Sequence, residues 1–417
     1  MVSKPQIEFL GLRKNALVIT TSSFFLGIGR LMVATFFNHY ALYIGAPVIV
    51  LGLFSTVQGL VRIFLAAPLG YLGDRVGNRR KWIMVMGDAL SALAYFVYIG
   101  VNSWVLLIPG LILESAWPVT SPVKSSILSD SINPEKRGIA LATRALTIGL
   151  PGTFAPFVGG VLLDSMGMAQ GMPVLLMIAG LFRAIGTLFE AILIKENKTQ
   201  TQNYEAKTEI EIGILGRIKN PVLDMFGPFS SIKTLRVMAI ISFAGYIGVS
   251  VINRFQSVYV TNVIGLRKTE WGLISGISLA VGALIRIPLG KLTDVFGRKK
   301  CILIDYFIRP IYFLTFARAT GFNTVLLLNI LNNFSGEAGA PAWQALLLDI
   351  TPRGSRGRVH GVFSMIQAAS MSVFPGISAF LWDVYGAEWA FYLPGIIDAL
   401  TLVAIYLFLK EPKEAER

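Results

Sequence analysis

Charged residues are scarce in this chain of 417 residues. Only 15% of the residues are charged and 54% are hydrophobic, whereas about a quarter are charged in an ordinary soluble domain. A soluble fold would leave much of this apolar surface in contact with water. The composition therefore excludes a typical soluble domain and predicts a chain whose surface faces a lipid bilayer or other apolar helices.

Metal ligands and nucleotide-binding motifs are also rare. Cys301 is the single cysteine, and His39 and His360 are the two histidines. An internal disulfide is therefore impossible, and neither a cysteine-based metal cluster nor an HExxH metalloenzyme site is expected. The Walker sequence GxxxxGK[ST] is absent, so ATP is not expected to drive this protein directly. We expect no enzyme activity, no cofactor and no metal.

The charge balance is strongly positive, at +13, with 37 Lys and Arg residues against 24 Asp and Glu. In a soluble protein this excess would suggest a nucleic-acid partner. Here many cations gather in short loops between apolar runs, at 74–81, 135–137 and 298–300, and at 13–14 before the first run. Cytoplasmic loops of membrane proteins carry such an excess. We therefore predict that these loops are cytoplasmic and that there is no nucleic-acid partner.

Long apolar runs divide the chain into twelve predicted spans, because a spanning helix needs about 20 mostly apolar residues. An even number places both termini on one side of the cell (plasma or inner) membrane, and the basic loops make that side the cytoplasm. We expect a multi-pass protein that is monomeric. The predicted spans are 15–43, 48–72, 82–102, 104–130, 139–163, 172–195, 235–263, 269–292, 301–320, 324–350, 358–384 and 389–410.

A polar stretch at 196–234 separates six spans from six. It predicts an N-terminal six-helix bundle at 1–195, a cytoplasmic linker at 196–234 and a C-terminal six-helix bundle at 235–417. Within the linker, 209–226 has the pattern of a short interfacial helix. A plain tether between the bundles is an equally good interpretation.

A loop sequence occurs twice in the chain. PLGYLGDRVGNRRK at 68–81 and PLGKLTDVFGRKK at 288–300 align at an offset of 220 residues, and each joins two apolar runs. A second motif, DxxxxxxRG, begins at Asp130 and again at Asp349, an offset of 219 residues. Repeats of this period in a hydrophobic chain indicate two homologous membrane halves, as in many secondary transporters.

The GxLxDRxGRR/K type of loop resembles the signature between the second and third helices of the major facilitator superfamily. The DxxxxxxRG motif resembles that superfamily's loop between its fourth and fifth helices. This resemblance covers nearly the whole chain. It implies an all-α integral membrane protein in which twelve transmembrane helices form two pseudo-symmetric six-helix bundles around a central cavity. It also implies alternating access, in which the cavity opens to each side in turn.

By the same resemblance, the repeated loops close the cytoplasmic side. Asp74 can accept hydrogen bonds from amides at the start of an adjacent helix, and the basic residues after it can pair with Asp130. The alternative is that these charges only orient the helices in the membrane. The predicted gating residues are Gly70, Asp74, Arg75, Gly77, Arg79, Arg80, Asp130, Arg137, Gly290, Asp294, Gly297, Lys299, Asp349 and Arg356.

Ionisable residues deep in a bilayer are costly and usually mark a pathway or a relay. By resemblance, the first, fourth, seventh and tenth helices line the central cavity. Their runs carry Arg30, Glu114, Arg254 and Glu337 near their middles. The glutamates are the predicted proton carriers, and the arginines are predicted to hold the substrate or its counter-charge. Structural salt bridges are the alternative interpretation.

Other membrane charges are harder to interpret from sequence. Arg286 resembles the anion-binding arginine of the nitrate and monocarboxylate branches, and Arg62 is a further candidate in the second run. Asp305 and Arg309 are four residues apart, so we expect them to neutralise each other on one helix face. No partner is predicted for Asp398. The residues expected to extend toward the cytoplasmic surface are Asp88, Lys124, Arg144, Arg183 and Glu190.

These observations predict a secondary active transporter of a small solute, with protons as the coupling ion because the candidate site contains carboxylates. The stretch 149–160 partly matches the GxxxGPxxGG sequence associated with proton-coupled drug exporters. It favours export of amphiphilic or drug-like compounds. The deep arginines favour an alternative, a carrier of small organic anions such as carboxylates or phosphate esters. A remote alternative is a non-transporting membrane sensor on the same fold.

Overall fold

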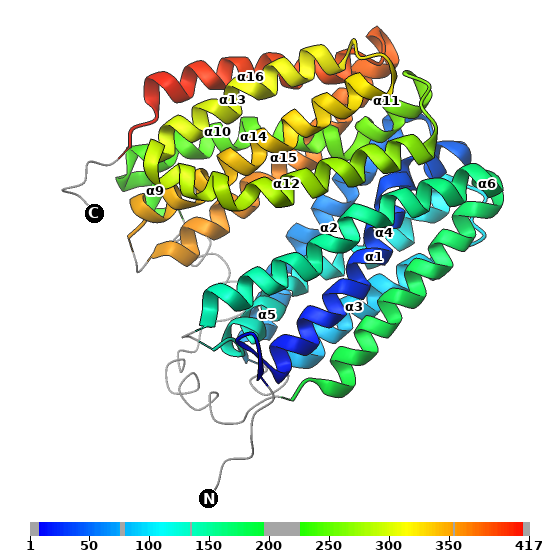
Figure 1. Cartoon of the computed structure of the whole chain (residues 1–417), viewed down its shortest axis with the longest axis horizontal. Helices are drawn as coiled ribbons and strands as arrows, with labels where there is room; N and C mark the ends of the chain where they lie inside the picture. The colour runs from blue at the N-terminus through cyan, green and yellow to red at the C-terminus, as the bar shows by residue number, and fades with distance from the viewer. Residues whose placement is uncertain (1–7, 76–79, 134–135, 196–225, 353–354, 412–417) are drawn as a thin grey trace, which may run out of the picture. The chain divides into compact units, whose positions relative to one another are not determined.

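The computed structural model describes residues 8–75, 80–133, 136–195, 226–352 and 355–411, and this part of the chain is almost entirely helical (Figure 1). A pair of two-residue antiparallel strands precedes the first helix. The elements are β1 (Glu8–Phe9), β2 (Leu12–Arg13), α1 (Lys14–Tyr43), α2 (Val48–Arg75), α3 (Arg80–Val97), η2 (Trp104–Leu106), α4 (Leu107–Glu114), α5 (Ala116–Asp130), α6 (Arg137–Leu193), α9 (Gly227–Ser231), α10 (Lys233–Val251), η5 (Ile252–Gln256), α11 (Ser257–Asn262), α12 (Lys268–Phe296), α13 (Arg298–Phe316), α14 (Gly321–Ile350), α15 (Arg356–Tyr385) and α16 (Trp389–Phe408).

The predicted apolar runs coincide with these helices. The fifth and sixth runs both lie within α6, where Gly167 interrupts the helix with a φ of 73°. Glycine adopts this positive φ without the steric cost of a Cβ atom, so Gly167 divides α6 into two helical segments. Six segments among the described residues are long and apolar enough to cross a membrane. The helical fold with membrane-length helices is confirmed, and the number of twelve spans stays a prediction.

The chain forms two compact units, the first of residues 1–46 and 60–211 and the second of residues 47–59 and 212–417. The first part of α2 thus groups with the second unit. Most of the predicted linker lies outside the described residues, which resume at 226 with α9 and α10. The predicted interfacial helix at 209–226 falls almost wholly in that stretch, and the boundaries at 195 and 235 stay predictions.

Each unit has its own packed interior. In the first unit α1 packs along α6, and α3 packs against α5 and α6. In the second unit α10 packs on α15 and α16, α13 packs on α14 and α16, and α12 packs on α14. Both units keep large apolar side chains exposed, such as Leu284 at 76% and Ile192 at 72%. Such exposed apolar surface suits hydrocarbon rather than water.

Candidate functional site

Three of the predicted pathway residues lie together in the first unit. The Arg30 guanidinium of α1 lies over the Trp117 ring, 4.9 Å from its centroid. Glu114, the last residue of α4, accepts a hydrogen bond from the Tyr98 hydroxyl at 3.3 Å. Arg62 of α2 is within electrostatic range of both Arg30 and Glu114, and its buried Nε atom has no hydrogen-bond partner. The arrangement brings two cations and one carboxylate together.

In the second unit, Glu337 of α14 pairs with Arg286 of α12. The Arg286 Nε atom donates to Glu337 Oε2 at 2.7 Å, and a terminal nitrogen donates to Oε1 at 2.6 Å. This two-point geometry is the strongest arrangement available to arginine and a carboxylate. The Arg286 side chain is still 55% exposed and that of Glu337 19%. Both residues were candidates from the sequence, but their pairing was not foreseen.

Arg254 has different partners in the same unit. It lies in η5, a single π-helical turn between α10 and α11. Its Nε atom donates to Ser55 Oγ at 2.5 Å, and a terminal nitrogen donates to Gln58. Arg254 thus lies among polar side chains of α2. Single π-helical turns are rare and often occur at functional sites.

The predicted gating residues are described mainly in the second unit. Gly297 connects α12 to α13 with a φ of 89°, which glycine adopts readily. An ion pair joins Arg298 Nε to Asp349 Oδ2 at 3.1 Å. Lys299 Nζ donates to the Tyr406 carbonyl at 2.9 Å, and Arg356 donates to the Leu348 carbonyl at 3.3 Å. Of the other predicted gating residues, Gly77 and Arg79 lie outside the described residues. The remaining ones lie in described helices, but the surroundings of their side chains are not described: Gly70, Asp74, Arg75, Arg80, Asp130, Arg137, Gly290 and Asp294.

The pairing within α13 differs from the expectation. Arg309 was expected to neutralise Asp305, but its Nε atom donates to Asp398 Oδ2 of α16 at 3.0 Å. A terminal nitrogen of Arg309 donates to the Gly245 carbonyl of α10 at 2.5 Å. The Asp305 carboxylate instead accepts a hydrogen bond from the Ser335 hydroxyl of α14. One arginine thus holds α10, α13 and α16 together.

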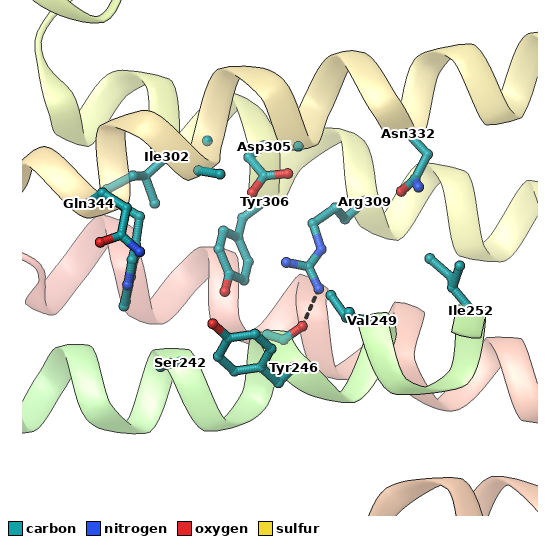
Figure 2. Close-up of a pocket in the computed structure, with 15 residues that line it drawn as sticks. Ser242, Tyr246, Val249, Ile252, Ile302, Asp305, Tyr306, Arg309, Asn332 and Gln344 are labelled. Atoms are coloured by element: carbon teal, nitrogen blue, oxygen red, sulfur yellow. Dashed lines mark hydrogen bonds between the residues drawn. The ribbon is translucent and has the colours of Figure 1, made fainter. Parts of the chain in front are cut away.

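A cavity of about 320 Å³ opens beside these charges. Figure 2 shows Asp305 and Arg309 among Tyr246, Tyr306 and Asn332, with a dashed line for the Arg309 hydrogen bond. The remaining lining residues are Ser242, Gly245, Val249, Ile252, Ile302, Gly336, Gly339, Ala340, Trp343 and Gln344. These residues come from α10, η5, α13 and α14. Apolar and aromatic walls with a few fixed polar groups are typical of small-molecule sites.

Glycine keeps room for the carboxylate in this cavity. A Cβ atom on Gly339 would lie 2.3 Å from Asp305 Oδ2 and 2.6 Å from Asp305 Cβ. A Cβ atom on Gly336, which also lines the cavity, would meet no atom within 4 Å. Gly339 is therefore required for the close approach of α13 and α14, whereas Gly336 leaves open space.

The first unit contains a second group of buried charges that was not predicted from the sequence. Lys124 and Glu190 were expected to extend toward the cytoplasmic surface, yet the Glu190 side chain is 0% exposed and that of Lys124 11%. They pair with each other and with Asp88. Arg183 is also buried and donates to Ser91 Oγ at 2.6 Å. The expectation was wrong because position along a run gives depth but not which neighbour a side chain faces.

No group of three or more His, Cys, Asp or Glu side chains that could hold a metal ion occurs among the described residues. The charged groups of both units are thus arranged as pairs and clusters of arginine or lysine with carboxylates.

Comparisons with known proteins agree on one family. A family profile described as Major Facilitator Superfamily matches residues 19–259 and 238–417. The Multi-drug resistance efflux pump PmrA homolog of Lactococcus lactis is 24% identical over 373 residues, which are 87% of each chain. An uncharacterized MFS-type transporter of Methanocaldococcus jannaschii is 25% identical over 179 residues, so the match spans 43% of this chain and only 46% of that relative.

Solved structures show the same fold. A crystal structure of a mutant of the nucleoside transporter NupG has a TM-score of 0.76 and 16% sequence identity to this chain. The similarity covers 95% of this chain and 100% of that one. At this identity the likeness shows the shared fold.

Proposed function

Because this chain belongs to the Major Facilitator Superfamily, we propose that it is a secondary active transporter that exports amphiphilic or drug-like compounds in exchange for protons. Alternating access would move the solute across the membrane, as the family resemblance implies.

The cavity of the second unit carries this proposal. Its volume of about 320 Å³ falls at the lower end of the range of about 300–1,000 Å³ for small-ligand pockets. Tyr246 and Trp343 offer aromatic faces, and Asp305 supplies a carboxylate beside them. Arg309 also lines the cavity, but its guanidinium donates to Asp398 and to the Gly245 carbonyl. An aromatic wall beside the Asp305 carboxylate therefore suits an amphiphilic compound that carries a positive charge. The Lactococcus lactis relative is named a multi-drug resistance efflux pump, and this name supports the same substrate class.

A second candidate function follows from the first unit. Arg30, Arg62 and Glu114 bring two cations to one carboxylate, which leaves an excess positive charge for an anionic solute. This arrangement favours a carrier of small organic anions. Binding of an anion by the arginines would also change the proton affinity of Glu114.

A thermal-shift panel on the purified protein separates the two candidates. Ligand binding to the native state raises the unfolding midpoint by mass action. We expect the cationic dye ethidium to raise it and benzoate and glucose 6-phosphate to leave it unchanged. Asp305→Asn should weaken ethidium binding about tenfold, a loss of about 1.4 kcal/mol, whereas Asp383→Asn, an exposed carboxylate on α15, should not. Stabilisation by the anions alone would favour the second candidate.

We also propose that both termini and the 196–234 linker are cytoplasmic, as the basic loops indicate. Asn102 and Lys136 lie in loops that this topology places on opposite sides of the membrane. A cysteine at Asn102 should react with an impermeant thiol reagent added to intact cells, whereas one at Lys136 should not. Native Cys301 is buried, so it gives a low background. Labelling of the cysteine at Lys136 but not of the one at Asn102 would show that the topology is the opposite of the proposed one.

A further inference from the structure

Three ionisable side chains from three helices meet inside the first unit. Lys124 Nζ of α5 lies 3.2 Å from Asp88 Oδ2 of α3 and 2.5 Å from Glu190 Oε1 of α6. The Asp88 and Glu190 side chains are 1% and 0% exposed. The cluster is therefore sealed from solvent on its carboxylate side.

The charges of this cluster do not balance. Two ionised carboxylates and one ammonium leave one negative charge without a counter-ion. An uncompensated charge in an apolar interior is very costly, so such groups usually neutralise by binding a proton. Two carboxylates that share one site cannot both ionise easily. Electrostatics alone thus calls for one additional positive charge at this position.

The hydrogen bonds of the cluster also indicate that a proton is bound there. Asp88 Oδ1 and Glu190 Oε2 are buried and have no hydrogen-bond partner, and one ammonium group, that of Lys124, contacts the other oxygen of each carboxyl group. Lys124 and the Ser22 hydroxyl both contact the other Glu190 oxygen, Oε1. Two ionised carboxylates cannot bond because neither has a hydrogen to donate. A proton on either group turns one of these unpaired oxygens into a donor and removes the excess negative charge.

The surrounding helices bring no second cation to these oxygens among the described residues. α1 faces the cluster with the neutral Ser22 hydroxyl. Arg183 lies two turns before Glu190 on α6, but its guanidinium donates to Ser91 and lies over the Tyr95 ring at 5.4 Å. The charged groups that act on Glu190 are Lys124 and Asp88.

We propose that Asp88 and Glu190 share one proton and that this cluster, rather than Glu114 or Glu337, is the site at which the transporter takes up and releases its coupling proton. The assignment rests on the proposed proton-coupled transport. The proton comes from the aqueous phase and returns to it, and no covalent bond between heavy atoms changes. Because Lys124 is on α5, a shift of α5 against α3 and α6 changes the charge beside the carboxylates and hence their hold on the proton.

Infrared difference spectroscopy on the purified full-length protein tests the shared proton directly. The wild type at neutral pH should show the carbonyl stretching band of a protonated carboxylic acid. Glu190→Gln and Asp88→Asn should each weaken this band by the contribution of one acid, because the remaining carboxylate is neutralised one-to-one by Lys124. Any contribution of Asp305 or Asp398 stays the same in these variants. Lys124→Met should strengthen it, because both carboxylates must then be protonated.

Asp164→Asn is the matched control, since Asp164 is an exposed carboxylate on the same helix as Glu190. Its spectrum should keep the band. An unchanged band in both Glu190→Gln and Asp88→Asn would overturn the proposal. Glutamine and asparagine have the size and hydrogen-bonding groups of the protonated acids, so folding should survive, and gel filtration of each variant verifies this. The two variants are independent, so a folding defect in one leaves the other decisive.

Transport in proteoliposomes tests whether the proton is the coupling proton. With an imposed pH gradient, Glu190→Gln should lose accumulation of ethidium above equilibrium and keep exchange of ethidium across the membrane. Full proton-driven accumulation by this variant would overturn the coupling role. If the wild type moves no ethidium at all, the proposed export function fails, while the infrared result still decides whether the proton is present.

Discussion

The two units each bury two carboxylates beside one cation, and the cation acts differently in each. In the first unit Lys124 contacts both carboxylates with one ammonium group. In the second unit Arg309 donates to Asp398 and to the Gly245 carbonyl, while Asp305 accepts from a serine hydroxyl and interacts with Arg309 without a hydrogen bond. The charge count is equal, but only the second cluster is built around a fork of directed hydrogen bonds.

This difference follows from the chemistry of the two cations. Lysine carries a compact charge on a flexible stem, whereas the planar guanidinium fixes several acceptors at once. An ammonium that serves two carboxylates can shift between them as protons come and go. A guanidinium that joins three helices instead fixes the wall of a cavity. The first cluster is thus suited to changing its proton content, and the second to keeping its shape.

The largest expected effect is on stability, when each cation is removed. Arg309→Met leaves Asp398 and the Gly245 carbonyl without their donor, and loss of one partner of a buried pair costs about 3–5 kcal/mol. Lys124→Met should cost less, because Asp88 and Glu190 can both become neutral by protonation. Reversible unfolding in detergent micelles measures both. Arg236→Met, at an exposed position on α10, is the control, and a larger loss for Lys124→Met would contradict this account of the two cations.

An intermediate effect is expected at the wall of the cavity. Gly339→Ala should destabilise the protein by about 1–3 kcal/mol, the usual cost of overpacking a close contact, because the new methyl group would collide with Asp305. It should also weaken ethidium binding. Gly336→Ala adds the same methyl group on the same helix into open space and should change neither quantity. Equal effects of the two substitutions would show that the loss comes from replacing any glycine of α14, and not from the collision with Asp305.

The smallest stability effect is expected at the ends of the helices. The side chains of Arg298 and Asp349 are 18% and 25% exposed, and asparagine keeps a side-chain oxygen to which Arg298 can donate, so Asp349→Asn should cost about 1 kcal/mol. Transport should fall much more than stability if this pair belongs to the gate. Uptake in proteoliposomes and the unfolding midpoint, measured on one preparation, separate these effects. Normal uptake would limit Asp349 to a role in orientation, the alternative left open by the sequence.

Sequence alone predicted the helices well because apolar length and glycine are local signals. The division of α6 at Gly167 and the turn at Gly297 both follow from where glycine occurs. Family membership was equally accessible from the repeated loops. These features depend on residues close together in the chain, and a single sequence reports them directly.

Partners that are distant in sequence could not be predicted in this way. Arg286 and Glu337 were each named as candidates, but their pairing joins positions 51 residues apart on different helices. Asp398 had no predicted partner because Arg309 precedes it by 89 residues. One signal was available: a lone acid in a long apolar run needs a buried cation, and few runs offered one. To predict the Asp88–Lys124–Glu190 cluster, the acids in one apolar run would likewise have to be matched with a lysine in another run.

The π-helical turn η5 has a consequence for the aromatic packing beyond it. A π turn holds one more residue than an α turn, and each residue rotates an α-helix by about 100°. Tyr259, three residues after the end of η5, donates to the Ala317 carbonyl and packs against Trp382 and Phe391. Deleting Phe255, which follows Arg254 in η5, would turn Tyr259 away from all three partners while Arg254 kept its place. The extra residue therefore sets the phase between a polar segment of the helix and the aromatic segment that follows it.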